Sequence, residues 1–347
     1  MKLLIIGGTG VISSAIALQA LEKGWEVTAV NRGSRIPTFA SRIRTIKADR
    51  QNKEDFAKAL AAEKPDVVID MICFDEADAK QTVSLFRNRS EHLVFTSSVA
   101  AYARPYVSTP TCEDRESLSQ DKTFAYGYGK ARMEEYLNEE MKKPGAAVTI
   151  IRPSLTFGPS ARNFGLLRQN YNVISRIRQG KPLVMFGEGM FPWTFTYVDD
   201  LAQGFVLAAG NPKVYNDTYQ VLNTETVVWE DLYRTVGKIL GADPKLVYVP
   251  SILLRELDEK LMGHLWYEKC YCSLFSIEKF QKAVPEYKPR FTFREGITKV
   301  IESWEREGLG IDPVKDKLED DIIGCYERFR NDLMTLRSDR QYAHSFK

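Results

Sequence analysis

The chain opens with Lys2-Leu3-Leu4-Ile5-Ile6 followed by Gly7-Gly8-Thr9-Gly10-Val11-Ile12-Ser13, and the predicted fold is built outward from this segment. A strand-length apolar run that ends in glycines and opens a helical pattern is typical of a phosphate-binding turn. Gly7 and Gly10 leave no Cβ in the path of a pyrophosphate, and the N–H groups that begin the helix can hold its charge. The cofactor-binding residues predicted here are Gly7, Thr9, Gly10, Val11 and Ile12. A purely structural turn is the alternative interpretation.

The spacing is Gly-x-x-Gly-x-x-Ser, so Ser13 replaces the third glycine of the usual pattern. That position normally allows tight packing of helix on strand, and serine is small enough to fit there.

The end of the second predicted strand bears on which dinucleotide binds. It reads Asn31-Arg32-Gly33-Ser34-Arg35 and lacks the carboxylate that would bond the ribose hydroxyls of NAD. Arginine suits bidentate phosphate binding, so Asn31 and Arg32 favour NADP, with NAD as the alternative. The competing interpretation of Arg32 is a solvated loop residue. Asp49, after the third predicted strand, is expected to reach the adenine end.

The first half alternates apolar β-branched runs with helical patterns, which predicts an α/β fold with a doubly wound parallel (Rossmann) sheet. The predicted strands are Lys2–Ile6, 26–30, 45–47, Val67–Asp70, His92–Thr96 and Ala147–Arg152, and predicted helices include 13–23, 53–62 and 125–141. After Pro153 the alternation fades. A helix is expected to start at Asp200 as its N-cap, and further helical patterns occupy 228–240, 251–262 and 293–307.

These patterns divide the chain into three parts. We expect a dinucleotide-binding domain of 1–159, to which 193–212 returns, a smaller mixed substrate-binding region of 160–192 and 213–306, and a helical extension of 307–347. One helical face of the extension is assigned to Ile322, Ile323, Tyr326, Phe329, Leu333 and Met334. This face is interpreted as a cap on the protein's own surface rather than as an oligomer contact, although a homodimer stays open.

Composition narrows the classes of partner. The net charge of +2, with 44% hydrophobic and 27% charged residues and no basic run, makes nucleic acid an unlikely partner and a small-molecule substrate the expected one. Five scattered cysteines and three histidines predict reduced thiols and no metal site. The first apolar run is too short for a signal core or a membrane span, so we expect a cytoplasmic protein without membrane contact.

A second motif supplies candidate chemistry. In Tyr126-Gly127-Tyr128-Gly129-Lys130, the tyrosine and lysine are four residues apart and share one helical face. A nearby ammonium favours the phenolate and lowers the tyrosine pKa from its usual value of about 10, which makes a general acid or base near neutral pH. Ser98 follows the fifth predicted strand, where a hydroxyl can bond a reacting carbonyl. Serines that merely end a strand are the competing interpretation.

The ordered motifs together resemble the extended short-chain dehydrogenase/reductase superfamily, and more narrowly its NAD-dependent epimerase/dehydratase family. They are Gly7-Gly8-Thr9-Gly10, Ser97-Ser98-Val99-Ala100-Ala101-Tyr102, Tyr126…Lys130, Arg152-Pro153-Ser154-Leu155-Thr156-Phe157-Gly158-Pro159 and Tyr197-Val198-Asp199-Asp200-Leu201. The resemblance covers roughly residues 1–305. It implies that Ser98, Tyr126 and Lys130 are catalytic and that Ser98 and Tyr126 also contact the substrate. It further implies that Lys130 holds the nicotinamide ribose, that Pro153 lies near the nicotinamide, and that Glu113 is the acidic residue in the loop before the tyrosine.

Departures from the family pattern bear on the substrate. Trp193 stands where nucleotide-sugar members carry an arginine that clamps the diphosphate, so a nucleotide-sugar substrate is in doubt. We assign Trp193 and Arg162 to the substrate site, with Arg168 and Arg176 as further candidate clamps. Val99 and Ala100 stand where dehydratases carry acids, which ranks an epimerase or reductase above a dehydratase. The alternative from another class is a catalytically silent dinucleotide-binding scaffold or an RNA-binding protein of the same fold, with Arg42, Arg44, Lys47 and Arg50 as a local basic surface.

Overall fold

The computed structural model describes residues 1–34, 37–159, 161, 165–167 and 170–336. It divides the chain into two compact units. Unit 1 comprises 1–161, 193–226 and 271–296, and unit 2 comprises 162–192, 227–270 and 297–347.

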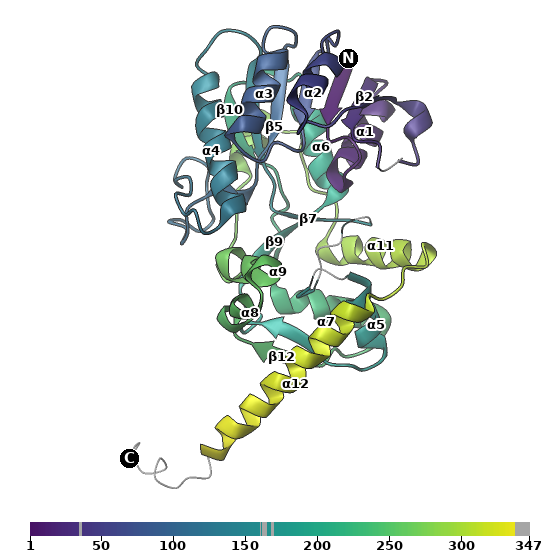
Figure 1. Cartoon of the computed structure of the whole chain (residues 1–347), viewed down its shortest axis with the longest axis vertical. Coiled ribbons are helices and arrows are strands. Elements are labelled where there is room, and N and C mark those ends of the chain that lie inside the picture. The colour runs from purple at the N-terminus through teal and green to yellow at the C-terminus, as the bar shows by residue number, and fades with distance from the viewer. Residues whose placement is uncertain (35–36, 160, 162–164, 168–169, 337–347) are drawn as a thin grey trace. The chain divides into compact units, whose positions relative to one another are not determined.

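Unit 1 is built on a seven-stranded sheet in the order β10-β6-β5-β4-β1-β2-β3, and every neighbouring pair is parallel (Figure 1). Its strands are β1 (Lys2–Ile6), β2 (Glu26–Asn31), β3 (Arg44–Lys47), β4 (Val67–Asp70), β5 (His92–Thr96), β6 (Ala147–Arg152) and β10 (Asp217–Gln220). All residues of β4, β5 and β6 are buried, as a sheet covered on both faces requires. The predicted doubly wound α/β fold is therefore confirmed.

The helices of unit 1 are α1 (Val11–Glu22), α2 (Lys53–Ala59), α3 (Glu76–Phe86), α4 (Ala125–Glu140), α6 (Val198–Ala208) and α10 (Glu278–Ala283). One apolar core joins alternate strand residues, such as Leu4 and Phe95, to Phe56 of α2, Phe86 of α3 and Met133 of α4. Two further strands, β7 (Leu155–Phe157) and β9 (Pro192–Tyr197), pair in parallel. The chain passes between the units within β11 (Thr226–Val228) and α11 (Phe293–Arg306).

Two expectations for this unit need correction. Asp200 is not an N-cap, because α6 already begins at Val198, and the buried Asp200 carboxylate instead accepts the backbone N–H groups of Arg290 (2.9 Å) and Phe291 (3.1 Å). β10 was not predicted, since Asp217-Thr218-Tyr219-Gln220 contains no apolar run. Because β10 joins the sheet, 213–226 belongs to unit 1, and so does 271–296, whereas the sequence pattern placed both with the substrate region.

Unit 2 contains a parallel pair of strands and several helices. These elements are α5 (Asn170–Arg178), β8 (Leu183–Phe186), α7 (Trp229–Leu240), β12 (Leu246–Val249), α8 (Ser251–Leu257), α9 (Glu259–His264), a π-helical turn (Leu265–Lys269) and α12 (Pro313–Thr335). The single helix expected over 251–262 is broken at Asp258, whose carboxylate accepts the N–H of Leu261 at 2.9 Å and so caps α9.

The prediction for the C-terminal extension was only partly right. A helix is present, but Ile322 and Ile323 are buried while Phe329, Leu333 and Met334 are exposed. At about 100° per residue, Ile322, Phe329 and Leu333 point in nearly the same direction, so the exposure changes along the helix and not around it. Only the first half of α12 covers the protein's own surface.

Candidate functional site

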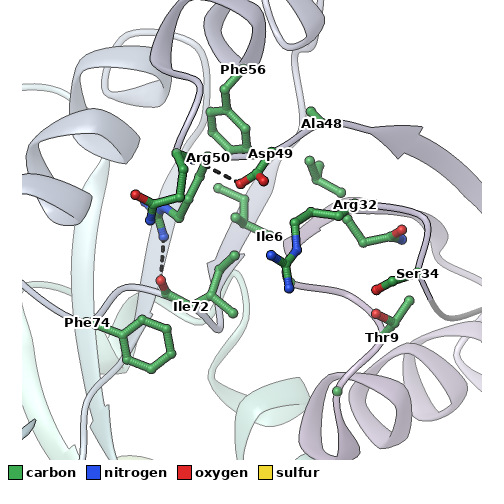
Figure 2. A pocket seen from close by; sticks show the side chains of 15 residues that line it. Ile6, Thr9, Arg32, Ser34, Ala48, Asp49, Arg50, Phe56, Ile72 and Phe74 are labelled. Carbon is green, nitrogen blue, oxygen red and sulfur yellow. Dashed lines mark hydrogen bonds between the residues drawn. The ribbon is translucent and has the colours of Figure 1, made fainter.

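A pocket of about 490 Å³ opens at the carboxyl ends of β1, β2, β3 and β4 (Figure 2). Its lining residues are Ile6, Gly7, Thr9, Gly10, Val30, Asn31, Arg32, Ser34, Ala48, Asp49, Arg50, Gln51, Phe56, Ile72 and Phe74. Ligands of doubly wound sheets gather at this edge of the sheet. The pocket brings together Gly7, Thr9, Gly10, Asn31, Arg32 and Asp49 of the predicted cofactor residues.

The glycine turn packs closely against neighbouring residues of the protein. Gly7 has a φ of +84°, and a Cβ there would lie 2.6 Å from the Ile72 side chain. A Cβ on Gly8 would lie 2.5 Å from that of Ala29, so Gly8 allows the close approach of the turn to β2. Ser13 is small enough for this position, as expected, and it also forms two hydrogen bonds. Its hydroxyl donates to the Gly7 carbonyl at 2.8 Å and accepts the Gly10 N–H at 2.8 Å. The residue in place of the third glycine therefore holds the turn closed.

This turn fits a dinucleotide phosphate. A Cβ on Gly10 would meet only the Ser13 hydroxyl, at 3.3 Å, and the Gly7 carbonyl, at 4.0 Å. Val11 and Ile12 begin α1, where backbone N–H groups have no carbonyl of a preceding turn to bond. No acidic residue lies in the first turn of α1 to repel an anion.

The end of β2 presents a guanidinium to the pocket. The Asn31 side chain accepts the Gly33 N–H at 2.8 Å and so shapes the loop. Arg32 extends into the pocket, and Ser34 lies near Thr9 on the pocket wall (Figure 2). Asp49 lies on the pocket wall, and its carboxylate accepts the Gln51 N–H at 3.0 Å.

Arg50 lines the same pocket but is not available to a ligand phosphate. It is buried, and its guanidinium donates to Asp70 at 3.0 Å and to the Ile72 carbonyl at 2.7 Å, with an ion pair to Asp78 at 3.2 Å. Within the alternative of an RNA-binding protein, Arg50 is therefore not part of a basic surface, and Arg44 forms an ion pair with Glu63. The buried network fixes the loop after β4, from which Phe74 reaches the pocket.

Lys130 connects the loop after β4 to the end of β5. It is buried on α4, and its ammonium donates to the carbonyls of Cys73 and Thr96, both at 2.6 Å. Its Nζ lies 5.1 Å from the centre of the Phe74 ring and 5.9 Å from that of Tyr126. Burial lowers the pKa of the Lys130 ammonium. The same burial raises the pKa of the Cys73 thiol well above its usual range, so this thiol stays neutral.

Tyr126 and Ser98 flank the place where helix α4 packs closely against the turn Val99–Ala101. Ser98 caps the short turn Val99–Ala101, and its hydroxyl accepts the Ala100 N–H at 3.1 Å. A Cβ on Gly127 would lie 2.5 Å from the Ala100 carbonyl, and one on Gly129 would lie 2.7 Å from the Phe74 carbonyl. The two glycines therefore let α4 approach both loops. Tyr126, next to Gly127, is 45% exposed.

A buried ion pair beneath these residues was missed from the sequence. Glu134, one turn after Lys130, accepts from the Arg152 Nε at 2.9 and 3.0 Å and also from the Ser97 hydroxyl. The Arg152 guanidinium stacks 4.4 Å from the centre of the Tyr102 ring. Glu134 thus ties α4 to the ends of β5 and β6. Glu134 lies four residues after Lys130, just as Lys130 lies four after Tyr126, and this repeat is the pattern that could have revealed it.

The remaining predicted residues lie in different settings. The Pro153 carbonyl accepts the Val99 N–H at 3.0 Å, beside the Ser98 turn. Glu113 accepts the Gln220 N–H at 2.7 Å at the sheet edge. Trp193 is only 1% exposed, which makes its ring part of the packing of unit 1.

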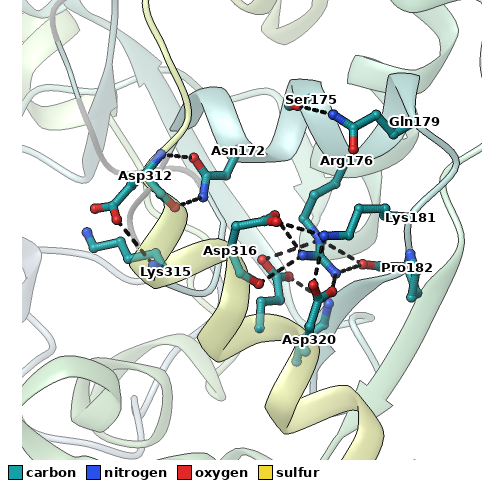
Figure 3. A network of polar contacts seen from close by, with 12 residues as sticks. Asn172, Ser175, Arg176, Gln179, Lys181, Pro182, Asp312, Lys315, Asp316 and Asp320 are labelled. Carbon is teal, nitrogen blue, oxygen red and sulfur yellow. Dashed lines mark hydrogen bonds and ion pairs between the residues drawn. The ribbon is translucent and has the colours of Figure 1, made fainter.

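Of the three arginines considered as phosphate clamps, one has a clear outcome. Arg176 is buried and bonds Asp316 at 2.8 Å and Asp320 at 2.7 Å (Figure 3), so its assignment as a clamp is wrong. Arg162 and Arg168 lie outside the described residues.

Within the described part of the chain, no group of three or more His, Cys, Asp or Glu side chains is placed to hold a metal ion. No helix there is both long enough and apolar enough to cross a membrane.

Comparisons with known proteins agree with the sheet and the turn. The chain is 24% identical to a 2'-dehydrokanamycin reductase of Streptomyces kanamyceticus over 251 residues, which is 72% of this chain and 70% of the relative. It is 26% identical to chloroplast stem-loop binding protein of 41 kDa b of Arabidopsis thaliana over 319 residues, or 86% of this chain and 77% of the relative.

Among solved structures, the fold matches a UDP-glucose 4-epimerase of Thermus thermophilus in complex with NAD. The TM-score is 0.69 at 18% identity, over 88% of this chain and 99% of the other. At this identity the likeness establishes the fold alone. A sequence match to the family described as "NAD dependent epimerase/dehydratase family" extends over residues 3–221. The chain, with its glycine turn, parallel sheet and Tyr126…Lys130 helix, therefore belongs to the NAD-dependent epimerase/dehydratase family of extended short-chain dehydrogenases/reductases.

Proposed function

We propose that this protein is an NAD(P)-dependent oxidoreductase that transfers hydride at a secondary alcohol or ketone of a sugar, sugar nucleotide or related small molecule. The observation that carries the proposal is the position of the buried Lys130 ammonium. It bonds the Cys73 carbonyl after β4 and the Thr96 carbonyl at the end of β5, at the same sheet edge as the glycine-turn pocket.

Each group has a role that its chemistry suits. The dinucleotide, when bound, supplies or accepts the hydride. The Tyr126 hydroxyl gives a proton to the carbonyl oxygen during reduction and takes it back during oxidation. The Ser98 hydroxyl donates to the same oxygen and polarises it. The Lys130 ammonium has three donors, of which two hold strand carbonyls, and the third is assigned to a ribose hydroxyl.

NADP is the proposed cofactor, with NAD as the alternative. Arg32 projects into the pocket, and Ser34 supplies a hydroxyl to the lining of the same pocket. We assign the phosphate on the adenosine ribose to this pair, the pyrophosphate to Gly7, Thr9, Gly10, Val11 and Ile12, the adenine end to Asp49, and the nicotinamide end to Pro153.

Titration calorimetry with NADP and NAD tests this assignment. Arg32→Ala should weaken NADP binding by about tenfold or more and leave NAD binding nearly unchanged, because it removes a charge-assisted contact to phosphate. Equal losses for both dinucleotides would contradict the role of Arg32.

The substrate is a carbonyl or alcohol compound, and among the described candidates neither Trp193 nor Arg176 can clamp a diphosphate. Trp193 cannot neutralise a diphosphate, and Arg176 is committed to its acidic partners. This favours a reductase or epimerase of less charged substrates, and the similarity to a 2'-dehydrokanamycin reductase points the same way. Thermal-shift titration with nucleotide sugars, aminoglycoside-like ketones and simple ketones would rank the classes, since a ligand of the native state raises its stability.

Similarity to a chloroplast stem-loop binding protein favours one second candidate, an RNA-binding or catalytically silent scaffold. Salt-dependent RNA binding without oxidation of reduced cofactor would support this candidate. The same result in a protein that binds NADP would contradict the oxidoreductase proposal.

A further inference from the structure

Phe74, in the loop after β4, is an exposed aromatic side chain in the wall of the glycine-turn pocket. It lines the same pocket as Gly7 and Gly10, and it lies at the opposite end of the lining from Ser34 (Figure 2). Its ring is 52% exposed. A single apolar side chain on an open surface needs no explanation, but a ring that lines a pocket offers apolar area for a ligand to cover.

The backbone of Phe74 is held from both sides of its loop. The Asp78 carboxylate accepts the Phe74 N–H at 2.9 Å, and Asp78 itself pairs with the buried Arg50 at 3.2 Å. From the side of α4, the Lys130 ammonium bonds the preceding carbonyl at 2.6 Å. A Cβ on Gly129 would lie 2.7 Å from the Phe74 carbonyl, so the helix also packs directly on this residue. The exposed ring therefore projects from a backbone that is fixed in place.

The ring lies next to the residues assigned to hydride transfer. The Lys130 Nζ lies 5.1 Å from the centre of the Phe74 ring and 5.9 Å from that of Tyr126. The glycine turn is assigned to the pyrophosphate, and Lys130 to the ribose that carries the nicotinamide. A pocket residue beside Lys130 therefore lies at the reacting end of the bound dinucleotide.

The two ends of the pocket differ in chemistry. The segments after β2 and β3 contribute the polar side chains of Arg32, Ser34 and Asp49. The loop after β4 contributes the apolar side chains of Ile72 and Phe74. The polar end suits a phosphate and ribose hydroxyls. The apolar end suits a flat ring that is uncharged in the reduced dinucleotide.

We propose that Phe74 binds the nicotinamide riboside end of the dinucleotide through apolar contact with its aromatic ring. This inference rests on the proposed function, because it takes Lys130 as the residue that holds the same ribose. Covering the ring contributes affinity in proportion to the apolar area removed from water. The ring also takes the place of water beside the reacting end, where the hydrogen bonds of Tyr126 and Ser98 to a substrate oxygen are then less screened.

Titration calorimetry with two ligands separates the two ends of the pocket. NADPH carries the nicotinamide riboside, whereas adenosine 2′,5′-bisphosphate carries only the adenosine half. If NADH binds more tightly than NADPH, NADH and ADP take their places. Phe74→Ala should weaken dinucleotide binding by about tenfold and leave binding of the adenosine ligand unchanged, because only the dinucleotide loses apolar contact. Phe74→Leu should retain most of the affinity, since it keeps a large apolar side chain.

Val107→Ala is the matched control. Val107 belongs to unit 1, is 81% exposed and lies outside the lining of the pocket, so its truncation should alter the binding of neither ligand. Because the Phe74 ring is half exposed, Phe74→Ala should melt as close to the wild type as Val107→Ala does. Equal melting temperatures would separate a lost ligand contact from a damaged fold.

The fluorescence of bound NADPH or NADH supplies a readout that needs no turnover. Reduced nicotinamide emits at shorter wavelength when apolar side chains replace the water around it. The wild type and Phe74→Leu should therefore shift the emission to the blue, and Phe74→Ala should shift it less.

Equal dinucleotide affinity and emission in the wild type and Phe74→Ala would overturn the proposal. An equal loss of dinucleotide and adenosine ligand would also overturn it, because the whole pocket would then be affected. A wild type that binds neither dinucleotide would overturn it together with the proposed function. If the expected binding pattern is found but no ketone is reduced, the assignment of Phe74 is supported and only the oxidoreductase proposal fails.

Discussion

Arg152 in unit 1 and Arg176 in unit 2 are both buried arginines that fix a helix, yet their surroundings differ. Arg152 relies on one carboxylate, Glu134, which is fully buried. Arg176 is shared among Asp316, Glu319 and Asp320, and the Asp320 side chain is 44% exposed. A single dehydrated pair has no substitute if one partner is lost, whereas a partly hydrated cluster has several. The link between α4 and the end of β6 therefore depends on one ion pair, and the attachment of α12 on a redundant set.

The largest effect is expected for Glu134→Gln. It leaves the Arg152 guanidinium buried without a counter-charge, which typically costs about 3–5 kcal/mol of unfolding free energy. Because Glu134 also holds Ser97 next to Ser98, kcat should fall more than KM rises. Urea unfolding and steady-state kinetics would measure the two effects. Glu135→Gln, on the exposed side of the same helix, is the control and should change neither by much.

A second test concerns His92, a histidine of unit 1 that is buried away from water. His92 is fully buried, and burial lowers its pKa to about 3. Its Nε2 donates to the Thr149 hydroxyl at 2.8 Å, because that hydroxyl donates to the Val214 carbonyl, and its Nδ1 accepts the Gly210 N–H at 3.1 Å. The folded protein thus holds His92 neutral.

The unfolded chain protonates this imidazole below about pH 6.5, so the stability from His92 is complete above that pH. It is lost as the pH falls toward 3, by up to about 1.4 kcal/mol per pH unit. Unfolding free energies measured from pH 7 to 4 should fall less steeply in His92→Gln, whose amide can donate and accept in the same places. Parallel curves for the two proteins would contradict a neutral buried His92.

Arg176→Met should have a smaller effect than Glu134→Gln, on the order of 2 kcal/mol, because Lys181 still neutralises Asp316 and Asp320. The loss should be confined to α12, where hydrogen exchange would become faster while unit 1 stays protected. Faster exchange throughout unit 1 would show that the two networks are not separate.

The smallest effect is expected for Asp320→Asn. Its side chain is well hydrated, and such pairs contribute less than about 1 kcal/mol, with further weakening at high salt. Thermal unfolding at low and high salt would measure it. A loss of unfolding free energy as large as that of Glu134→Gln would show that the Arg176 cluster is no more tolerant than the Arg152–Glu134 pair.

The sequence predicted those features that repeat a local pattern. The strands β1, β4, β5 and β6 were predicted at their observed bounds, since each is an apolar run, and Lys130 was singled out by its spacing from Tyr126. Features that depend on distant partners were not predictable. From the sequence, Arg50 was interpreted as a surface cation, but in the structure it is buried and paired with Asp70. Arg176 was interpreted as a loop arginine, but it is paired with Asp316 of α12. Burial of a charge is decided by a carboxylate 20 or 140 residues away, which no local pattern records.

Hydride transfer beside Ser98, Tyr126 and Lys130 can be followed with an isotope label. The protein would be incubated with NADPH carrying deuterium at the transferable C4 position and a panel of ketones, and the alcohols analysed by mass spectrometry. We expect deuterated alcohol from the wild type, and on the order of a hundredfold less from Tyr126→Phe with NADPH affinity retained. Tight NADPH binding by the wild type with no label in any alcohol would contradict it and would identify the protein as a silent scaffold.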